Sequence, residues 1–181
     1  MINKLSANIA RFIRNNNAQA ASMEVLMFTL EVVFNAILVT SVILLVALAT
    51  GRFGEAVVML ASYLALRFFS GGAHLPTSKL CNISSVAIFV GLIFLPVSYW
   101  NAGFILNLLA FFLVLVYAPT KDIMQLSRLG PKYTIHFKII SLAIVALNFW
   151  IQSPLIALAF MTQTLSITPA AYKAVSYLER R

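Results

Sequence analysis

Residues 67–81 read Arg67-Phe68-Phe69-Ser70-Gly71-Gly72-Ala73-His74-Leu75-Pro76-Thr77-Ser78-Lys79-Leu80-Cys81, and residues 82–120, which follow directly, carry no formal charge. An apolar stretch of that length is enough for two membrane crossings, because one crossing takes about 20 residues. The polar segment before it holds the only cysteine of the chain and one of its two histidines. We therefore expect an all-α, polytopic integral membrane protein with a reactive polar segment between two of its spans.

The composition of the whole chain supports a membrane protein. Of its 181 residues, 61% are hydrophobic and 10% are charged, where a soluble domain has about 25% charged residues. Such a chain cannot cover a water-facing surface with polar groups, so part of its surface must face lipid. No linker or internal repeat is evident, and we expect one membrane-embedded domain over residues 1–181.

The net charge of +8 indicates an anionic partner. In a soluble protein this charge would favour nucleic acid, but here the cations lie between apolar spans. Anionic lipid headgroups or an acidic peptide are the more natural complement. We expect an anionic membrane as a partner and no nucleic acid.

Residues 1–17 are predicted to form an amphipathic interfacial helix. Apolar side chains recur at helical spacing on one face and polar side chains fall on the other. The apolar set is Ile2, Leu5, Ile9, Phe12 and Ile13, and the polar set is Lys4, Asn8, Arg11 and Asn15.

About six transmembrane helices are expected after it, and the positions of Lys and Arg define their orientation. The predicted spans are 23–50, 56–69, 83–97, 104–118, 139–151 and 155–167. With six spans, twelve of the 13 cations lie in segments on one side and only Arg52 lies on the other. Because positive residues accumulate on the cytoplasmic side, both termini and residues 67–81 are predicted to be cytoplasmic in a multi-pass protein of the cell membrane.

The residues of segment 67–81 are those that nucleophilic catalysis by a thiol requires. A thiol attacks a carbonyl as its thiolate, so it needs a base or a nearby positive charge. His74 precedes Cys81 by seven residues, and Pro76 argues against one uninterrupted helix between them. We expect a turn at 71–72 and a helix that begins near Pro76 and holds Cys81 a little over one turn inside, where the helix dipole gives limited support.

Four further residues of this segment have possible supporting roles. Gly71 and Gly72 allow positive φ and a close approach of the backbone, and their N–H groups could form an oxyanion hole. Lys79 could stabilise the thiolate. Arg67 could extend to the interface or bind a carboxylate of the substrate.

Each of these residues also has a structural interpretation. A single cysteine in an apolar protein is often a small buried hydrophobe. A glycine pair can serve close helix packing, while Arg67 and Lys79 can be positive-inside anchors. His136 is interpreted as an interface residue. One cysteine and two distant histidines do not form a metal site, so we expect no metal and no cofactor.

The pattern Arg67-x3-Gly71-Gly72-x-His74-x6-Cys81, in a small basic polytopic protein, resembles the accessory gene regulator B family. Tyr117-Ala118-Pro119, at the start of a large cytoplasmic loop, is similar to a second recurrent feature of that family. The resemblance implies a cysteine endopeptidase with a Cys81 and His74 catalytic pair and with Arg67, Gly71 and Gly72 in support. The loop after Pro119 departs from the family in being poorer in charge, which puts the identity of the substrate in doubt.

The implied reaction is the maturation of a quorum-sensing signal. A propeptide with an amphipathic helix and an acidic tail is cut on its C-terminal side, through a thioester on Cys81. An internal thiol or hydroxyl of the peptide then closes a thiolactone or lactone ring. The resemblance also implies a homodimer.

Two other functions are compatible with the composition. One is a small membrane transport or assembly subunit whose cysteine is incidental, although its spans contain almost no ionisable residues that could line a polar path. The other is a membrane transferase of phosphate-bearing lipids, which lacks clustered acidic metal ligands because Asp122 is the only aspartate.

Overall fold

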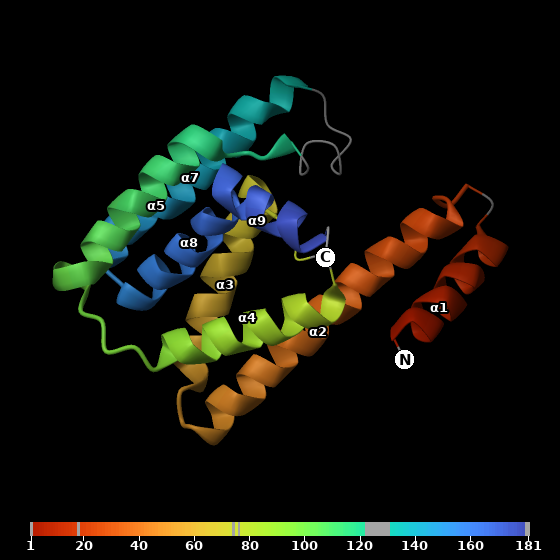
Figure 1. The fold of residues 1–181 in the computed structure, drawn as a ribbon, viewed down its shortest axis with the longest axis horizontal. Coiled ribbons are helices and arrows are strands. Elements are labelled where there is room, and N and C mark those ends of the chain that lie inside the picture. The colour runs from red at the N-terminus through yellow and green to blue at the C-terminus, as the bar shows by residue number, and fades with distance from the viewer. Residues whose placement is uncertain (1, 18, 74, 76, 122–130, 180–181) are drawn as a thin grey trace.

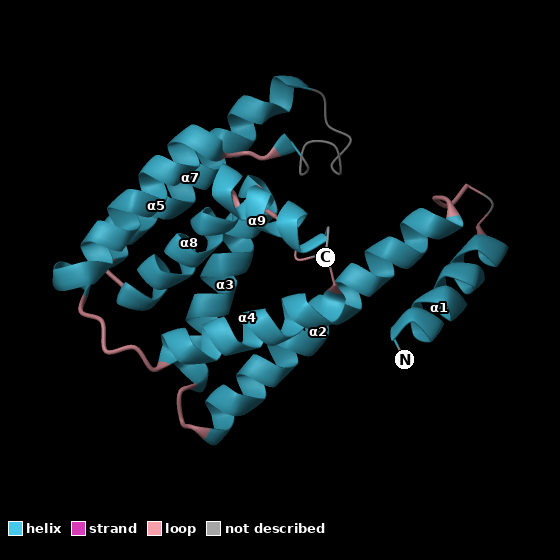
Figure 2. Cartoon of the chain, in the orientation of Figure 1, coloured by secondary structure: helices cyan, strands magenta, loops and turns pink. Residues whose placement is uncertain are grey.

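The computed structural model describes residues 2–17, 19–73, 75, 77–121 and 131–179, and their regular structure is entirely helical (Figures 1 and 2). This confirms the all-α class. The elements are α1 (Ile2–Asn16), α2 (Met23–Ala49), α3 (Phe53–Ser70), α4 (Ser78–Ile93), a π-helical turn η1 (Tyr99–Gly103), α5 (Phe104–Tyr117), a 3-10 turn η2 (Pro131–Tyr133), α7 (Thr134–Ile151), α8 (Pro154–Ser166) and α9 (Pro169–Glu179).

Each of the six predicted spans corresponds to a helix, but these helices differ in their ability to cross a membrane. Four described segments are long and apolar enough: α2, α3, residues 99–117 and α7. Helices α8 and α9 form a bent pair with an angle of 62°, and α4 has 16 residues. At 1.5 Å per residue α4 is about 24 Å long, less than the ~30 Å hydrocarbon core. Several membrane-spanning helices are therefore supported, and the number six stays a prediction.

The beginnings of three helices follow from their capping residues. The hydroxyls of Ser22, Thr77 and Ser153 each accept a hydrogen bond from the backbone N–H three residues later. These bonds satisfy N–H groups that lack a partner within the helix. Helix α7 ends at Ile151. The next residue, Gln152, has a φ of 58° in the left-handed region, which lets the chain reverse into α8.

The core consists of two hydrophobic clusters that share α3 and α8. The first cluster joins α2, α3 and α4 and contains Ile43, Met59, Phe89 and Ala159, the last from α8. The second joins α3, α5, α7 and α8 and contains Leu66, Val114, Val145 and Phe160. Figure 1 shows α8 passing between α3 and α5, with α2 and α4 paired on the other side of α3. Helix α8 is thus the most enclosed helix of the described structure.

Helix α1 runs antiparallel beside the first part of α2 (Figure 1). Its Ser6 and Ala10, one turn apart, are completely buried, while Leu5 and Phe12 are exposed. Small residues at this spacing let two helices approach closely. The predicted helix is therefore present, and its contact with α2 leaves Leu5 and Phe12 free to face lipid.

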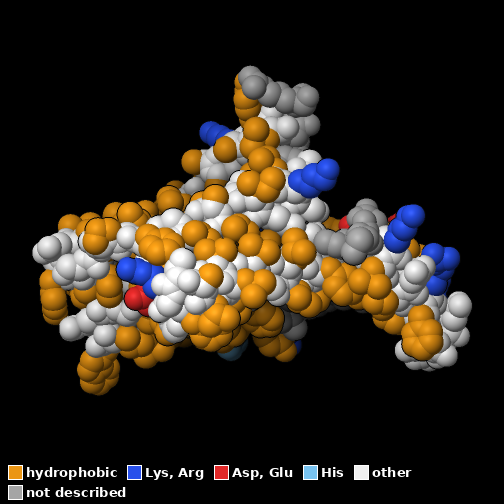
Figure 3. Space-filling model, turned by 90° about the horizontal axis from the view of Figure 1, so that it is seen from below, with side chains coloured by type: hydrophobic (Ala, Val, Ile, Leu, Met, Phe, Trp, Pro, Cys, Tyr) orange, Lys and Arg blue, Asp and Glu red, His pale blue; other side chains and the backbone are white. Residues whose placement is uncertain are grey.

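The molecular surface is strongly apolar. Apolar side chains cover most of the face shown in Figure 3, and charged groups occur on it in small patches. Large side chains such as Phe28, Ile37 and Trp150 are exposed, Trp150 by 89%. Because monomeric soluble proteins rarely expose large contiguous apolar patches, this surface fits a lipid environment.

Candidate active site

The predicted turn at the double glycine is confirmed. Gly71 has a φ of 74° and Gly72 a φ of 139°, values that side chains with a Cβ rarely adopt. The Gly71 N–H donates to the Arg67 carbonyl at 3.0 Å and closes helix α3. A Cβ on Gly72 would also lie only 2.6 Å from Nη1 of Arg67 and would collide with the hydroxyl of Ser166. Glycine is thus required at position 72 by both conformation and space.

Arg67 folds back over this turn from the last turn of α3. Its Nη2 donates to the carbonyls of Gly72 at 3.1 Å and of Ala73 at 3.2 Å. Its Nη1 donates to the hydroxyl of Ser166 at 3.0 Å and to Oε1 of Gln163 at 3.4 Å. The guanidinium therefore joins the glycine turn to the end of α8, a role that the sequence alone did not indicate.

Helix α8 contacts the turn through the side chain of Gln163 and the backbone of Ser166. Gln163, which is completely buried, donates through Nε2 to the hydroxyl of Ser70 at 2.9 Å and to the carbonyl of Gly71. The carbonyl of Ser166 accepts from the N–H of Ala73 at 2.9 Å. Sequence reasoning missed Gln163 and Ser166. The available signal was that polar side chains in an apolar helix require hydrogen-bond partners, but their partners lie more than 90 residues away.

The start of the polar loop also lies at this turn. The N–H of Thr120 donates to the carbonyl of Ser70 at 2.9 Å, and Thr120 is buried. The segment Tyr117-Ala118-Pro119 is therefore brought beside the end of α3. The two sequence features used for the family resemblance meet at this place.

Cys81 lies in the first turn of α4. The hydroxyl of Thr77 accepts from the N–H of Leu80, and the Thr77 carbonyl accepts from the N–H of Cys81 at 3.0 Å. The thiol residue is partly buried, and Lys79 is exposed on the same turn. The expected placement of Cys81 near a helix N-terminus is confirmed, with the helix beginning at Ser78.

Two residues of the predicted site lie outside the described residues, namely His74 and Pro76. The pairing of His74 with Cys81 therefore stays a prediction. The N–H groups of Gly71 and Ala73 are occupied by the Arg67 and Ser166 carbonyls. The expectation of an oxyanion hole in this turn consequently rests on the amide of Gly72.

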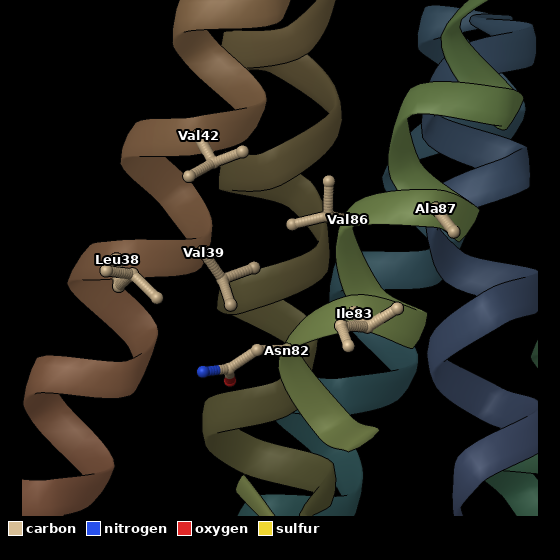
Figure 4. Close-up of a pocket in the computed structure, with 7 residues that line it drawn as sticks. All are labelled: Leu38, Val39, Val42, Asn82, Ile83, Val86 and Ala87. Atoms are coloured by element: carbon tan, nitrogen blue, oxygen red, sulfur yellow. The ribbon is translucent and has the colours of Figure 1, made fainter. Parts of the chain in front are cut away.

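Helix α4 is fixed to α2 directly after the cysteine. The Nδ2 of Asn82 donates to Oδ1 of Asn35 at 3.0 Å. Beside this bond an open, apolar groove lies between the two helices, and Figure 4 shows the side chains that line it. Its lining residues are Leu38, Val39, Val42, Asn82, Ile83, Val86 and Ala87. The groove begins at Asn82, the residue that follows Cys81 in the sequence, and a lipid chain or an apolar peptide segment would cover its apolar surface.

Within the described ranges, no three His, Cys, Asp or Glu side chains gather as a metal ligand set would require. The described residues supply a thiol in the first turn of a helix and, ten residues earlier in the sequence, a turn whose conformation is tightly specified. The described helices define an all-α protein with four to five candidate membrane spans and with a cysteine in the first turn of one helix.

Comparison with known proteins identifies the family. The sequence profile of accessory gene regulator B matches residues 6–170, and the chain belongs to that family. The accessory gene regulator protein B of Staphylococcus lugdunensis is 28% identical over 177 residues, which cover 93% of this chain and 94% of the relative. No solved structure is detectably similar.

Proposed function

We propose that this protein is a membrane-embedded cysteine endopeptidase that cleaves the C-terminal part of a quorum-sensing signal propeptide and promotes its cyclisation. Membership of the accessory gene regulator B family implies a role in processing an autoinducing peptide. The observation that supports cysteine catalysis is the turn that precedes the cysteine-bearing helix. In this turn Arg67 is hydrogen-bonded to the backbone of Gly71 and Gly72. A loop that only connects two helices does not require two glycines with positive φ and a bonded arginine.

The reaction begins with attack on the scissile carbonyl carbon. His74 accepts the thiol proton of Cys81, and the thiolate forms a bond to the carbonyl carbon. The C–N bond then breaks, and the imidazolium returns the proton to the departing amine. The C-terminal part of the propeptide leaves, and the N-terminal part stays attached to Sγ as a thioester.

The second half of the reaction regenerates the enzyme. A thiol or hydroxyl within the attached peptide loses its proton to His74 and attacks the thioester carbonyl. The new ring is a thiolactone or a lactone, and the thiolate of Cys81 is the leaving group. An intramolecular nucleophile has an effective concentration far above that of an external reactant, and an apolar site at the membrane surface reduces competition from water.

The partners follow from the charge and the surface. The proposed substrate has an amphipathic helix, which binds the same anionic membrane as the protein, and an acidic tail, which is attracted to a basic cytoplasmic face. The predicted topology places the site on the cytoplasmic side of the cell membrane. The active assembly is proposed to be a homodimer, as the family resemblance implies.

Substitution of the proposed catalytic pair tests this function. The full chain is placed in vesicles with anionic lipid, together with a synthetic propeptide taken from a short reading frame that neighbours the gene. Cys81→Ala and His74→Ala are each expected to abolish cleavage while the protein still inserts into the membrane. Complete processing by Cys81→Ala, or peptide flux across the vesicle membrane without cleavage by the wild type, would overturn the proposal.

A further inference from the structure

We infer that Gln163, assisted by Ser166, is a positioning residue for the proposed acyl transfer. From helix α8 these side chains hold Arg67 and the backbone of residues 71–73, and they thereby set the place from which the chain continues into His74. This inference rests on the proposed function, because it concerns the arrangement of the same catalytic pair.

The first observation is that Gln163 uses both ends of its amide on the turn. It is completely buried within an apolar helix. Its Nε2 donates to the Ser70 hydroxyl and the Gly71 carbonyl, and its Oε1 accepts from Arg67. Burial of an amide is costly unless it is hydrogen-bonded, so these partners fix its orientation closely.

The second observation is that Ala73 is held at both its N–H and its C=O. Its N–H donates to the Ser166 carbonyl at 2.9 Å, and its carbonyl accepts from Nη2 of Arg67 at 3.2 Å. Nη1 of Arg67 is in turn bonded to the Ser166 hydroxyl at 3.0 Å. The carbonyl of Ala73 belongs to the peptide unit that joins it to His74. These bonds fix the backbone of Ala73, the residue that precedes His74 in the sequence.

A second buried amide belongs to Asn148 of α7 and lies near the start of α8. Its hydrogen bonds serve for comparison, because they join helices away from the turn. Asn148 is also completely buried, and it bonds to Asn107 at 3.0 Å and to the carbonyl and N–H of Ser153. These contacts join α5, α7 and the start of α8, and none of them involves residues 67–81. Asn148 is therefore a matched control for Gln163, since both are buried and bonded but only Gln163 contacts the turn.

The expected consequence of losing the Gln163 amide is catalytic. A misplacement of about 1 Å can reduce a rate by about 100-fold, whereas binding of a propeptide through its helix and tail is unaffected by the turn. Gln163→Met keeps a similar side-chain size and removes both hydrogen-bonding ends. We expect kcat to fall about 100-fold while KM changes less than about twofold. Ser166→Ala, which keeps the backbone carbonyl, is expected to have a smaller effect of about tenfold.

A readout independent of the propeptide is the rate at which N-ethylmaleimide alkylates Cys81. The chain has one cysteine, so the mass of the intact protein reports its modification without ambiguity. Gln163→Met in vesicles is expected to be alkylated about tenfold more slowly than wild type, because the thiolate loses the support of a correctly placed base. Thr162→Val, whose hydroxyl bonds only within its own helix at the Leu158 carbonyl, is expected to match wild type.

The controls separate positioning from stability. Asn148→Leu is expected to lower the melting temperature at least as much as Gln163→Met, while its alkylation rate stays within about twofold of wild type. Similar alkylation and kcat losses in Asn148→Leu and Gln163→Met would overturn the inference. If Gln163→Met does not fold, Ser166→Ala supplies the same comparison, and wild-type rates in it would overturn the inference equally.

A double-mutant cycle with Arg67 completes the test. Because Gln163 and Arg67 hold the same turn, the loss in the Arg67→Gln, Gln163→Met double variant is expected to be smaller than the sum of the two single losses. Additive losses would contradict the inference. Failure of the proposed function has a different signature, since it would appear as processing by Cys81→Ala whatever the result at Gln163.

Discussion

At the scale of single residues, the turn of the proposed site contains a glycine that a residue with a Cβ would not fit. Gly72 combines a φ of 139° with the close approach of Arg67 and Ser166. Gly51 also has a positive φ, of 71°, but a Cβ there would meet nothing within 4 Å. The two glycines therefore separate the effect of backbone strain from the effect of collision.

Gly72→Ala is expected to abolish processing, and Gly51→Ala is expected to preserve it. A backbone forced into a rare conformation costs about 1–3 kcal/mol, and at position 72 the collision is added and displaces Arg67. Cleavage of the propeptide and alkylation of Cys81 measure the result in vesicles. Equal activity of the two variants would show that the space around Gly72 has no importance for the site.

Arg67→Lys distinguishes a guanidinium that organises the turn from a cation that merely anchors the helix. Lysine retains the charge but lacks the planar fork that reaches several acceptors at once. Because Arg67 bonds to the carbonyls of Gly72 and Ala73 and to Ser166, we expect Arg67→Lys to lower kcat by about 10- to 100-fold. An anchor alone would predict wild-type kcat, and that outcome would remove Arg67 from the site.

At the scale of elements, the sequence identified the helices well and their contacts poorly. The lengths of uncharged stretches located α2, α3, α4, α5, α7 and α8. The glycine pair and Pro76 placed the turn and the start of α4 within a few residues. The contact of Gln163 and Ser166 with residues 67–73 could not be found in this way. Hydrophobic periodicity shows that a helix is buried, but it does not show which distant turn its polar side chains meet.

The attachment of α4 to α2 yields a prediction at this scale. The hydrogen bond from Asn82 to Asn35 joins the cysteine helix α4 to α2, and both helices contribute to the first core cluster. Hydrogen bonds between membrane helices average about 0.6 kcal/mol and reach about 1.7. We expect Asn35→Leu to lower the free energy of unfolding in mixed micelles by an amount in this range.

A cycle of variants checks that the effect belongs to the bond. Asn82→Leu is expected to cost a similar amount, and the double variant is expected to cost less than the sum. Thr29→Val, on the same helix, loses a hydroxyl that bonds only to the Val25 carbonyl and is the matched control. Additive losses for Asn35 and Asn82 would contradict the coupling of α2 and α4.

At the scale of the whole molecule, the residues of the proposed site come from two packed groups of helices. The glycine turn is held by α3 and α8, whereas Cys81 belongs to α4, which packs mainly on α2. The uneven distribution of cations predicts that this end faces the cytoplasm. The four to five spans supported by length and composition leave the number of crossings to be measured.

Single cysteines in a Cys81→Ala background measure the topology directly. A membrane-impermeant maleimide applied to intact cells is expected to label Arg52→Cys. Lys4→Cys, Lys121→Cys and Lys173→Cys are expected to react only after the membrane is opened. This pattern requires an even number of membrane crossings between residues 4 and 121 and an even number between residues 121 and 173. Labelling of Lys173→Cys in intact cells would show that α8 and α9 do not return the chain to the cytoplasm as six spans require.

The most direct test of the account is a search for the acyl-enzyme on Cys81. The wild-type chain in vesicles is mixed with a propeptide whose internal thiol or hydroxyl nucleophile is replaced by alanine, and the reaction is quenched in acid. We expect the intact mass of the protein to increase by that of the N-terminal peptide fragment, and hydroxylamine to remove the increase. Cleavage of this propeptide with no adduct on Cys81 at any time, or an adduct that persists in Cys81→Ala, would contradict the account.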